Sequence, residues 1–275
     1  MPFRGAYLGP RGDMFMFAHV RGSLSTNTAR ATTYQTTLGG QLRAQVSPIV
    51  LREWQCQLPL SEPAEVGRFK GLVAGLYGLG PFSWVPVDAS VTNVLTPAMS
   101  MPGPKFATWT GAGTPAGSWV VPGMGQIRHS VIQTGTTLTF GTDTPVVPGL
   151  PISGGAFVAG SGEGRVSIQV LDQNGAILAT QVTRVQLTYT PVQVTASLPV
   201  VPASGVSARV VTAGGVQQAG LPSISWTTRA APWTPGGGSR AVVIDAYDSD
   251  LQQLNPAKHL YETVSFTVKE MSSNA

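Results

Sequence analysis

Apolar and polar residues alternate along short stretches of this chain, a pattern typical of half-buried β-strands. Near the N-terminus the alternation predicts strands over residues 29–35, 40–47 and 49–58. In the last of these, Trp54, Cys56 and Leu58 share one face, while Gln55 and Gln57 share the other. Such a strand belongs in an antiparallel sheet with one face toward solvent. Further strands are predicted over residues 14–20, 82–87, 240–246 and 261–269.

One helix is predicted, over residues 62–77. Ser61 is a favourable N-cap, and glutamates at the first turn suit the positive end of the helix dipole. An apolar stripe at three- and four-residue spacing predicts a buried face, and Gly78 is expected to end the helix. The stripe consists of Val66, Phe69, Val73 and Leu76.

A second stripe on this helix consists of Gly67, Gly71 and Gly75. An interior glycine costs a helix about 1 kcal/mol relative to alanine. We therefore expect a neighbouring backbone to approach this face closely, either this chain's own sheet or another subunit. A loosely specified helix is the alternative. The three glycines are the candidate assembly face.

The middle of the chain reads as a series of short strands between residues 119 and 228, which suggests a β-sandwich of jelly-roll type. Asn174-Gly175 between two such strands predicts a hairpin with a type I′ turn. The Gly-x-Gly patterns, including the one at 160–164, are interpreted as turns because no helix follows them.

Two changes of composition predict the domain boundaries. Prolines follow residue 96, and a Pro-Gly-Gly-Gly-Ser stretch occupies residues 235–239, which we interpret as a flexible connection. The residues after it are too few for a core of their own. We therefore expect residues 1–92 and 234–275 to form one mainly β domain with one helix, and residues 93–233 to be inserted in it.

Composition narrows the function. Only 11% of the 275 residues are charged, the net charge is +4, and glycine and proline number 33 and 22. The basic residues are scattered, whereas nucleic-acid binding needs clustered Lys and Arg. No apolar run reaches the roughly 18 residues of a membrane span. The single cysteine, Cys56, cannot form an internal disulfide, so we expect an inert thiol and synthesis in a reducing cytoplasm.

No catalytic or metal-binding constellation emerges, and we expect neither an enzyme nor a cofactor. The acids of the middle segment are interpreted as turn residues, and the acids after residue 244 as a polar loop without the Gly and Glu of an EF-hand. The three histidines leave a Ser-His-Asp set open, but no Gly-x-Ser-x-Gly elbow accompanies them. These residues are Asp143, Glu163 and Asp172; Asp245, Asp248 and Asp250; and His19, His129 and His259.

Aromatic side chains are the remaining candidates for ligand contact. Exposed Trp and Tyr on a jelly roll can stack on sugar rings, whereas core packing is the alternative. The candidates are Trp109, Trp119, Tyr189 and Trp226.

Two parts of the chain resemble the distal tail and minor tail proteins of long-tailed phages of actinobacteria. Residues 52–58 (REWQCQL), the helix after Ser61, residues 80–84 (GPFSW) and the ending YETVSFTVKEM are similar to the tail-tube-like belt domain. Residues 93–97 (NVLTP), 148–150 (PGL) and 170–175 (VLDQNG) are similar to galactose-binding-like jelly rolls.

This resemblance implies a structural virion protein, assembled in the host cytoplasm. It would form a hexameric ring that joins the tail tube to the baseplate, beside tail tube, tape measure and tail hub proteins. The jelly roll would face outward and could contact host glycans. Two alternatives stay open, a stand-alone carbohydrate-binding adhesin and a hydrolase of cell-wall glycans.

Overall fold

The computed structural model describes residues 5–17, 24–36, 41–61, 63–101, 110–116, 119–121, 123–127, 130–253 and 260–271. The described residues are mainly β, with fifteen strands and three helices, which confirms the predicted fold class. It divides into two compact units. Unit 1 comprises Met1–Pro10, Phe15–Trp84 and Arg240–Ala275, and unit 2 comprises Arg11–Met14 and Val85–Ser239.

The boundaries of these compact units differ from the predicted domain ranges. The chain passes into unit 2 at residues 84/85 and leaves it at 239/240, whereas the composition placed these points at 92/93 and 233/234. That unit 1 is a ring-forming belt domain and unit 2 a galactose-binding-like module stays a prediction.

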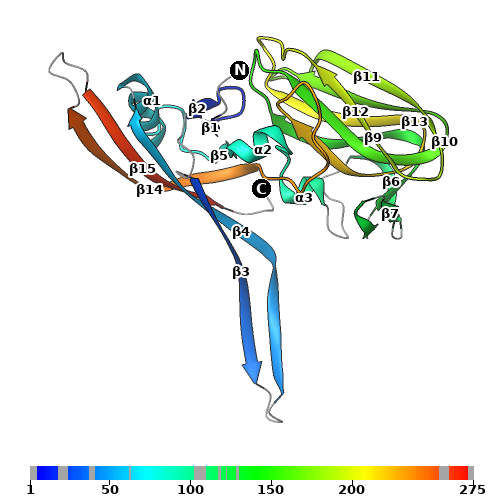
Figure 1. Ribbon diagram of the computed structural model, residues 1–275, viewed down its shortest axis with the longest axis horizontal. Helices are drawn as coiled ribbons and strands as arrows, with labels where there is room; N and C mark the ends of the chain where they lie inside the picture. Colours follow the sequence, from blue (N-terminus) through cyan, green and yellow to red (C-terminus); the bar gives the residue numbers. More distant parts are fainter. Residues whose placement is uncertain are drawn as a thin grey trace. The chain divides into compact units, whose positions relative to one another are not determined.

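Unit 1 is built on a seven-stranded sheet with the order β2-β1-β5-β14-β15-β4-β3 (Figure 1). Strands β4 and β15 pair antiparallel although they lie some two hundred residues apart, with Phe266 opposite Cys56 and Val268 opposite Trp54. The strands are β1 (Ala6–Gly9), β2 (Phe15–Phe17), β3 (Leu24–Thr36), β4 (Leu42–Ser61), β5 (Phe82–Val85), β14 (Ser239–Gln253) and β15 (Leu260–Glu270).

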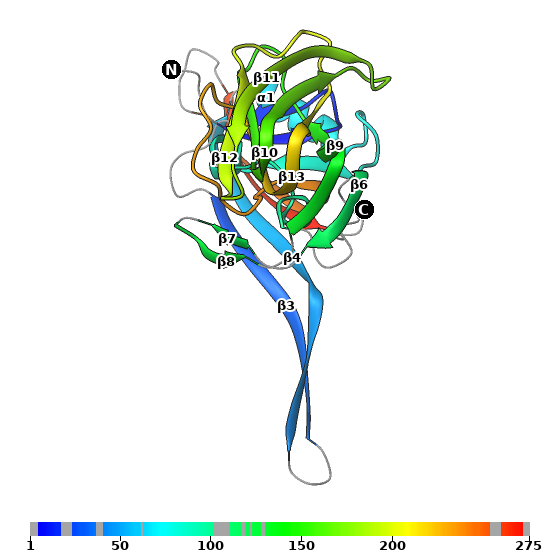
Figure 2. The ribbon, with the colours of Figure 1, turned by 90° about the vertical axis from the view of Figure 1, so that its right-hand side faces the viewer.

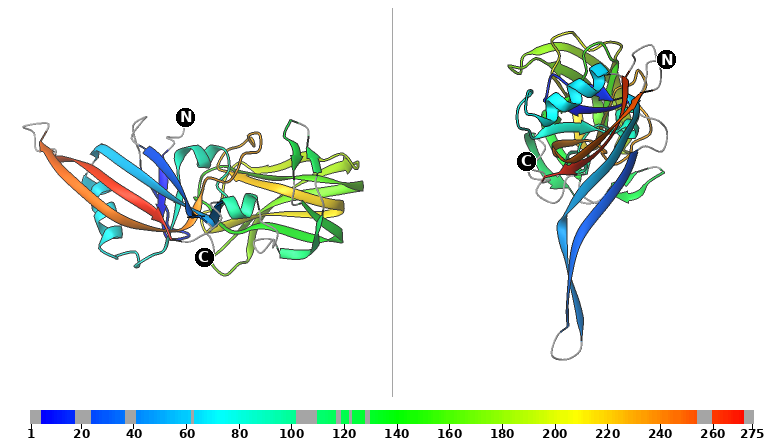
Figure 3. Two further views of the ribbon diagram at one scale, coloured as in Figure 1. Left: turned by 90° about the horizontal axis from the view of Figure 1, so that it is seen from below. Right: turned by 90° about the vertical axis from the view of Figure 1, so that its left-hand side faces the viewer.

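The helix α1 (Pro63–Val73) packs on one face of this sheet (Figure 3). Phe69 is fully buried, with its ring centroid 4.6 Å from that of Phe266 and 5.9 Å from that of Phe17. The predicted alternation in β4 is confirmed, because Trp54, Cys56 and Leu58 are buried and the glutamines between them are exposed.

On the same face, Arg52 and Glu270 form a buried ion pair that joins β4 to the end of β15. Two hydrogen bonds of 3.0 and 2.7 Å run from the guanidinium to the carboxylate. The guanidinium also lies 4.9 Å from the ring centroid of Trp54. The Arg52–Glu270 ion pair thus links strand β4, from the N-terminal part of the chain, to strand β15, near its C-terminal end.

The described residues of unit 2 form eight strands and two short helices that the sequence did not predict. The helices are α2 (Val87–Val91) and α3 (Pro97–Ser100). The strands are β6 (Thr110–Ala116), β7 (Trp119–Val121), β8 (Gly125–Ile127), β9 (Ser130–Pro145), β10 (Ile152–Leu171), β11 (Ile177–Leu187), β12 (Val192–Leu198) and β13 (Ser207–Ser225). Six of them form one sheet, in the order β11-β10-β13-β9-β6 with β12 also paired to β10, while β7 and β8 form a separate hairpin.

The long strands of this sheet fold over to make two layers (Figure 2). The first half of β10 pairs with β12 and its second half with β11. The two halves face each other across a core, because a Cβ added at Gly154 would lie 2.7 Å from the Cδ1 of Ile168. The prediction of a turn at 160–164 between separate short strands was therefore wrong, because β10 runs through these residues. The glycines of this segment lie in a β-bulge, which bends one continuous strand.

The hairpin at Asn174-Gly175 is confirmed, but its turn is not type I′. Only Gly175 has a positive φ, at 81°. The carboxylate of Asp172 accepts hydrogen bonds of 2.8 Å from the backbone N–H groups of Asn174 and Ala176. This five-residue loop is a type I turn followed by a left-handed glycine.

The predicted glycine connection at 235–239 is a packed segment. The N–H groups of Gly237 and Gly238 donate to the carbonyls of Asn93 and Leu95, at 2.9 and 3.1 Å. A Cβ at Gly238 would lie 2.1 Å from the carbonyl oxygen of Val94. Glycine is needed here because two backbones touch, so the segment closes unit 2 and does not act as a flexible connection.

Asn93 anchors this closure. Its side chain is fully buried, and its amide N–H donates to the carbonyls of Thr234 and Pro222 at 2.8 and 3.3 Å. Its Oδ1 accepts from the N–H groups of Leu95 and Ile224 at 3.3 and 3.2 Å. One side chain thus satisfies four buried backbone groups of three separate segments.

Candidate assembly surface and binding pockets

The hairpin of β3 and β4 projects beyond the rest of the unit 1 sheet as a two-stranded ribbon (Figures 1 and 2). Strand β15 pairs with β4 only from Glu53 to Ser61. Residues 29–36 and 42–51 pair only with each other in the described sheet. We call these residues the arm. Pro48 lies where the register of the arm shifts, as expected of a residue without a backbone N–H.

The end of the arm, residues 34–36 and 42–44, is exposed and amphipathic. Tyr34 lies opposite Ala44, and Leu42 opposite Thr36, so Tyr34 and Leu42 share one face; their exposed fractions are 64% and 67%. Gln35 lies opposite Arg43 on the other face. The sequence of the arm contains arginines but no acid. The predicted strands covered these residues, but their local alternation does not reveal that no third strand joins them.

The predicted glycine face of the helix needs correction. Helix α1 ends at Val73, and Gly75 follows it with a φ of 80° in a Schellman motif. In that motif the N–H of Leu76 bonds to the carbonyl of Gly71, and the N–H of Gly75 to that of Leu72. Gly75 is therefore the residue that terminates the helix, and Leu72 completes the buried stripe in place of Val73 and Leu76, which are exposed.

The other two glycines do not contact the backbone of the sheet. A Cβ at Gly67 would meet no described atom within 4 Å, and one at Gly71 would meet the side chains of Tyr77 and Leu76. Close packing by this chain's own sheet is thus ruled out for the described residues. A second subunit on this face stays a prediction.

Two of the four candidate sugar-stacking aromatics lie in the interior. Trp119 is 5% exposed and packs with Val121, Phe157 and Leu221 under the β7–β8 hairpin. Trp226 is 6% exposed. Neither offers a ring face to a ligand, so the stacking prediction is corrected for both. Tyr189 is 76% exposed, and Trp109 lies outside the described residues.

The candidate acids have local structural roles. Glu163 lies in β10 and pairs with Arg165 and Arg184 at 3.2 Å, so it is not a turn residue. Asp143, with a φ of 65°, pairs with Arg11. Within the described ranges, no three His, Cys, Asp or Glu side chains gather as a metal site requires.

The acids after residue 244 also differ from the prediction, because they lie in strand β14 and not in a loop. The carboxylate of Asp245 accepts from Lys269 at 2.7 Å, which raises the pKa of Lys269. Asp248 and Asp250 are exposed. The three candidate histidines lie outside the described residues.

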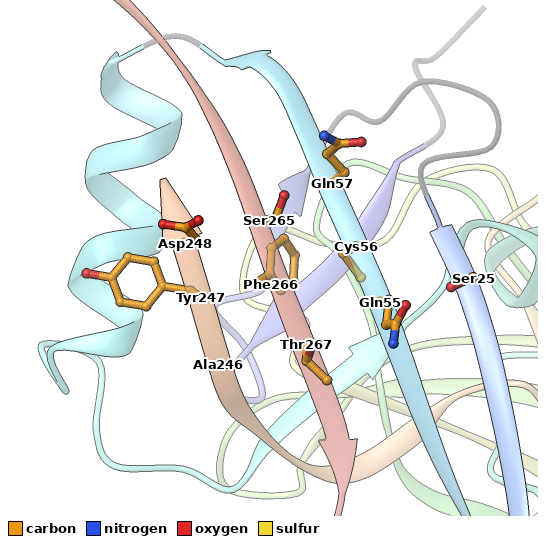
Figure 4. A pocket seen from close by; sticks show the side chains of 10 residues that line it. All are labelled: Ser25, Gln55, Cys56, Gln57, Ala246, Tyr247, Asp248, Ser265, Phe266 and Thr267. Carbon is orange, nitrogen blue, oxygen red and sulfur yellow. The ribbon is translucent and has the colours of Figure 1, made fainter. Parts of the chain in front are cut away.

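A shallow pocket of about 520 Å³ lies over strands β14, β15 and β4 of unit 1 (Figure 4). Its lining includes the amide and hydroxyl side chains of Gln55, Gln57 and Ser265, and the carboxylate of Asp248. Cys56 lies beside it, and burial raises the pKa of its thiol to about 12. This agrees with the predicted inert thiol.

A second pocket, of about 630 Å³, belongs to unit 2. It lies between β12 and the segment that follows β13. Gln193, Thr195 and Arg229 supply an amide, a hydroxyl and a guanidinium, and Ala230 to Pro232 form an apolar wall. The motif analysis of the sequence missed this pocket, because its polar residues are distant in sequence and follow no motif.

Among the described residues, no helix is both long and apolar enough to cross a bilayer. No protein-family model matches the sequence, and no curated protein matches it.

Several solved structures show a partial likeness. One is the enzymatically active domain of tailspike protein 4 from bacteriophage CBA120, with a TM-score of 0.38 and 15% identity over 48% of this chain and 21% of that one. Another is an arabinose-bound MgGH51 α-L-arabinofuranosidase, with a TM-score of 0.35 and 14% identity over 49% of this chain and 26% of that one. A third is the CBM22-1–GH10 part of Clostridium thermocellum xylanase 10B, with a TM-score of 0.33 and 12% identity over 43% of this chain and 26% of that one. At scores this low the likeness assigns neither a fold family nor an activity.

Proposed function

We propose that this chain is a structural protein of a bacteriophage tail tip whose copies assemble into a ring through unit 1. The arm is the observation that carries the proposal. A two-stranded hairpin is at best marginally stable in water unless another strand, helix or surface covers it. The exposed Tyr34 and Leu42 at its end lack such a cover within the described chain. A second copy can provide it.

The geometry favours a closed assembly. An arm that grips a different surface of its neighbour makes a head-to-tail contact, and such contacts generate rings when the rotation closes. The resemblance to distal tail proteins suggests six copies, located in the virion between the tail tube and the baseplate. In this role the chain binds tail tube, tape measure and tail hub proteins, and the proposal assigns it no catalytic step.

The test is the mass of the protein in solution. Sedimentation velocity and negative-stain images of the full chain should show a ring of several copies. A variant with residues 31–49 replaced by Asn-Gly closes the hairpin at the paired Arg30 and Val50, and it should be a folded monomer. As the control, Tyr189→Ser removes an exposed aromatic from unit 2 and should leave the ring intact. A wild-type chain that stays monomeric at every concentration would overturn the proposal.

The unit 2 pocket favours a second function, the binding of a glycan. Arg229 is exposed and, in the described part of the chain, forms no ion pair, so its guanidinium is free to bind a sugar carboxylate or vicinal hydroxyls. Binding of purified host cell-wall polysaccharides by the full chain should be lost in Arg229→Ala with Gln193→Ala. The control is Arg184→Ala, which lies outside the pocket. Equal binding by both variants would exclude this pocket as the site.

A further inference from the structure

The arm of one copy has a complementary surface on another copy, at the end of strand β14. Residues 246–251 of β14, which we call the β14 tip, pair with β15 along one edge. Their other neighbour in the sheet, β5, has four residues against the fifteen of β14, and it lies beside the first part of β14, away from the tip (Figure 1). Every residue of the tip except Ser249 is exposed.

The β14 tip is amphipathic in the same sense as the arm. Tyr247 and Leu251 lie on one face, with exposed fractions of 45% and 61%. Asp248 and Asp250 lie on the other face. The arm likewise presents Leu42 on one face and Arg43 on the other.

The charges of the two surfaces are opposite and unsatisfied. Arg43 on the arm is exposed and forms no ion pair with any described residue. The same holds for Asp248 and Asp250 on the tip, whereas neighbouring Asp245 is already paired with Lys269. Opposite charges on two surfaces steer their association and suppress the binding of wrong partners.

These two surfaces cannot meet within one chain. Leu251 lies opposite Glu262, which lies opposite Ser61 at one end of β4, while Leu42 is at the other end of that strand. The twenty residues from Leu42 to Ser61 span roughly 60 Å at about 3.3 Å per residue. Figure 1 shows the arm and the β14 tip at opposite ends of the unit 1 sheet.

We propose that the arm of one copy lies along the β14 tip of a second copy, an inference that rests on the proposed ring. Strand β4 supplies the edge that β15 leaves free beyond Glu53, and the tip supplies the edge that β5 leaves free. Strands placed edge to edge share the same two faces. The apolar side chains of arm and tip therefore meet on one side, and Arg43 meets Asp248 and Asp250 on the other.

Charge reversal tests this contact. Arg43→Glu alone, and Asp248→Arg with Asp250→Arg, should each lower the association constant of the full chain by about tenfold or more, as measured by sedimentation. Combining all three changes should restore assembly, because the opposite charges are again paired. The loss should be largest at low salt, since salt screens exposed charges. Arg184→Glu is the matched control, an exposed arginine of unit 2 outside the pocket that should leave assembly unchanged.

The outcomes separate this inference from the proposed function. A wild-type monomer at all concentrations overturns both. A ring that forms equally well in the wild type and in the two charge-reversed variants overturns only the contact between arm and tip. A loss in both variants without recovery in their combination also overturns it, because the charges would then act on different partners. Recovery in the combined variant supports it.

Discussion

Single residues of this protein matter most where backbones converge. Asn93 and the glycines at 160 and 236–238 lie at such points. In the sequence, Asn93 appeared only within the segment NVLTP that resembles galactose-binding-like jelly rolls, and the glycines were interpreted as turns or a flexible connection. A glycine that permits close backbone approach looks the same in one sequence as a glycine in a turn, so these roles could not be predicted without the structure.

Replacing Asn93 with leucine should lower the free energy of unfolding by about 3 kcal/mol or more. The apolar side chain has a similar size but removes the side-chain partner of the buried backbone groups of Leu95, Ile224 and Thr234, and each such group costs about 1–3 kcal/mol. Urea denaturation followed by circular dichroism measures the change. The control is Asn174→Leu in the exposed hairpin loop, where we expect a much smaller effect. An equal loss in both would contradict the anchoring role.

Two glycine-to-alanine changes should have opposite signs. At Gly160 a Cβ would lie 2.0 Å from the carbonyl oxygen of Gly215, so Gly160→Ala should destabilise the protein by about 1–3 kcal/mol. At Gly67 the space is open, and Gly67→Ala should stabilise α1 by up to about 1 kcal/mol. Thermal unfolding of both variants provides the measurement. Stabilisation by Gly160→Ala would refute the close approach in β10.

Cys56 should be unreactive in the folded protein. Its pKa of about 12 leaves almost no thiolate near neutral pH, so a thiol reagent should label it only after unfolding. The ordinary pKa of the thiol lies lower, at 9.0, so the unfolded chain loses this proton first as pH rises. The free energy of unfolding should therefore fall above pH 9, and Cys56→Ala should lack this part of the dependence. Rapid labelling of the native protein would contradict the assigned burial.

At the scale of elements, the alternation of residues located most strands of unit 1, most clearly in β4, where Trp54, Cys56 and Leu58 are buried and the residues between them are exposed. Strand β1, which is buried throughout and does not alternate, was not predicted. The extents were less predictable. Helix α1 ends four residues before the predicted end, because the left-handed conformation of Gly75 outweighs the apolar stripe. The predicted strands of unit 2 joined into longer ones, because bulges allow a strand to bend without ending.

The pairing of β4 with β15 should depend on the buried ion pair. Glu270→Gln leaves the Arg52 guanidinium buried without its carboxylate, which typically costs about 3–5 kcal/mol. Glu53→Gln on the same pair of strands is the control, because that carboxylate is more exposed and lies 3.8 Å from Lys269. It should cost less than about 1 kcal/mol. Chemical denaturation of both variants compares them, and similar losses would argue against the special role of the buried pair.

At the scale of the whole molecule, the chain leaves unit 1 briefly for Arg11–Met14 and then for the long insert Val85–Ser239, after which it returns to unit 1. The composition changes predicted such an insertion, but they left out residues 85–92, which contain α2, and the glycine segment, and both belong to unit 2. The sequence of a short helix or of three glycines does not reveal whether these residues pack in unit 1 or in unit 2. That assignment comes from hydrogen bonds such as the one from the N–H of Trp226 to the carbonyl of Ser90.

Unit 2 should fold alone when cut at its structural boundaries. Residues 85–239 retain the bonds of Asn93 to residues 222, 224 and 234, and they should unfold in one cooperative transition. Residues 93–233, cut where the composition changes, lack Thr234 and the segment that carries Gly237. They should be markedly less stable or aggregate. Calorimetry measures the unfolding temperature of each fragment. Equal stability of the two would show that the closing segment contributes little.

The paired segments 93–96 and 235–238 also bear on how such a chain can evolve. The two ends of the insert are joined to each other by their own backbone hydrogen bonds, so the point where the chain enters unit 2 after residue 84 and the point where it leaves lie side by side. A recombination event that exchanges everything between those two points would leave the β4–β15 framework untouched. Related particles could then change what they display while keeping the same scaffold.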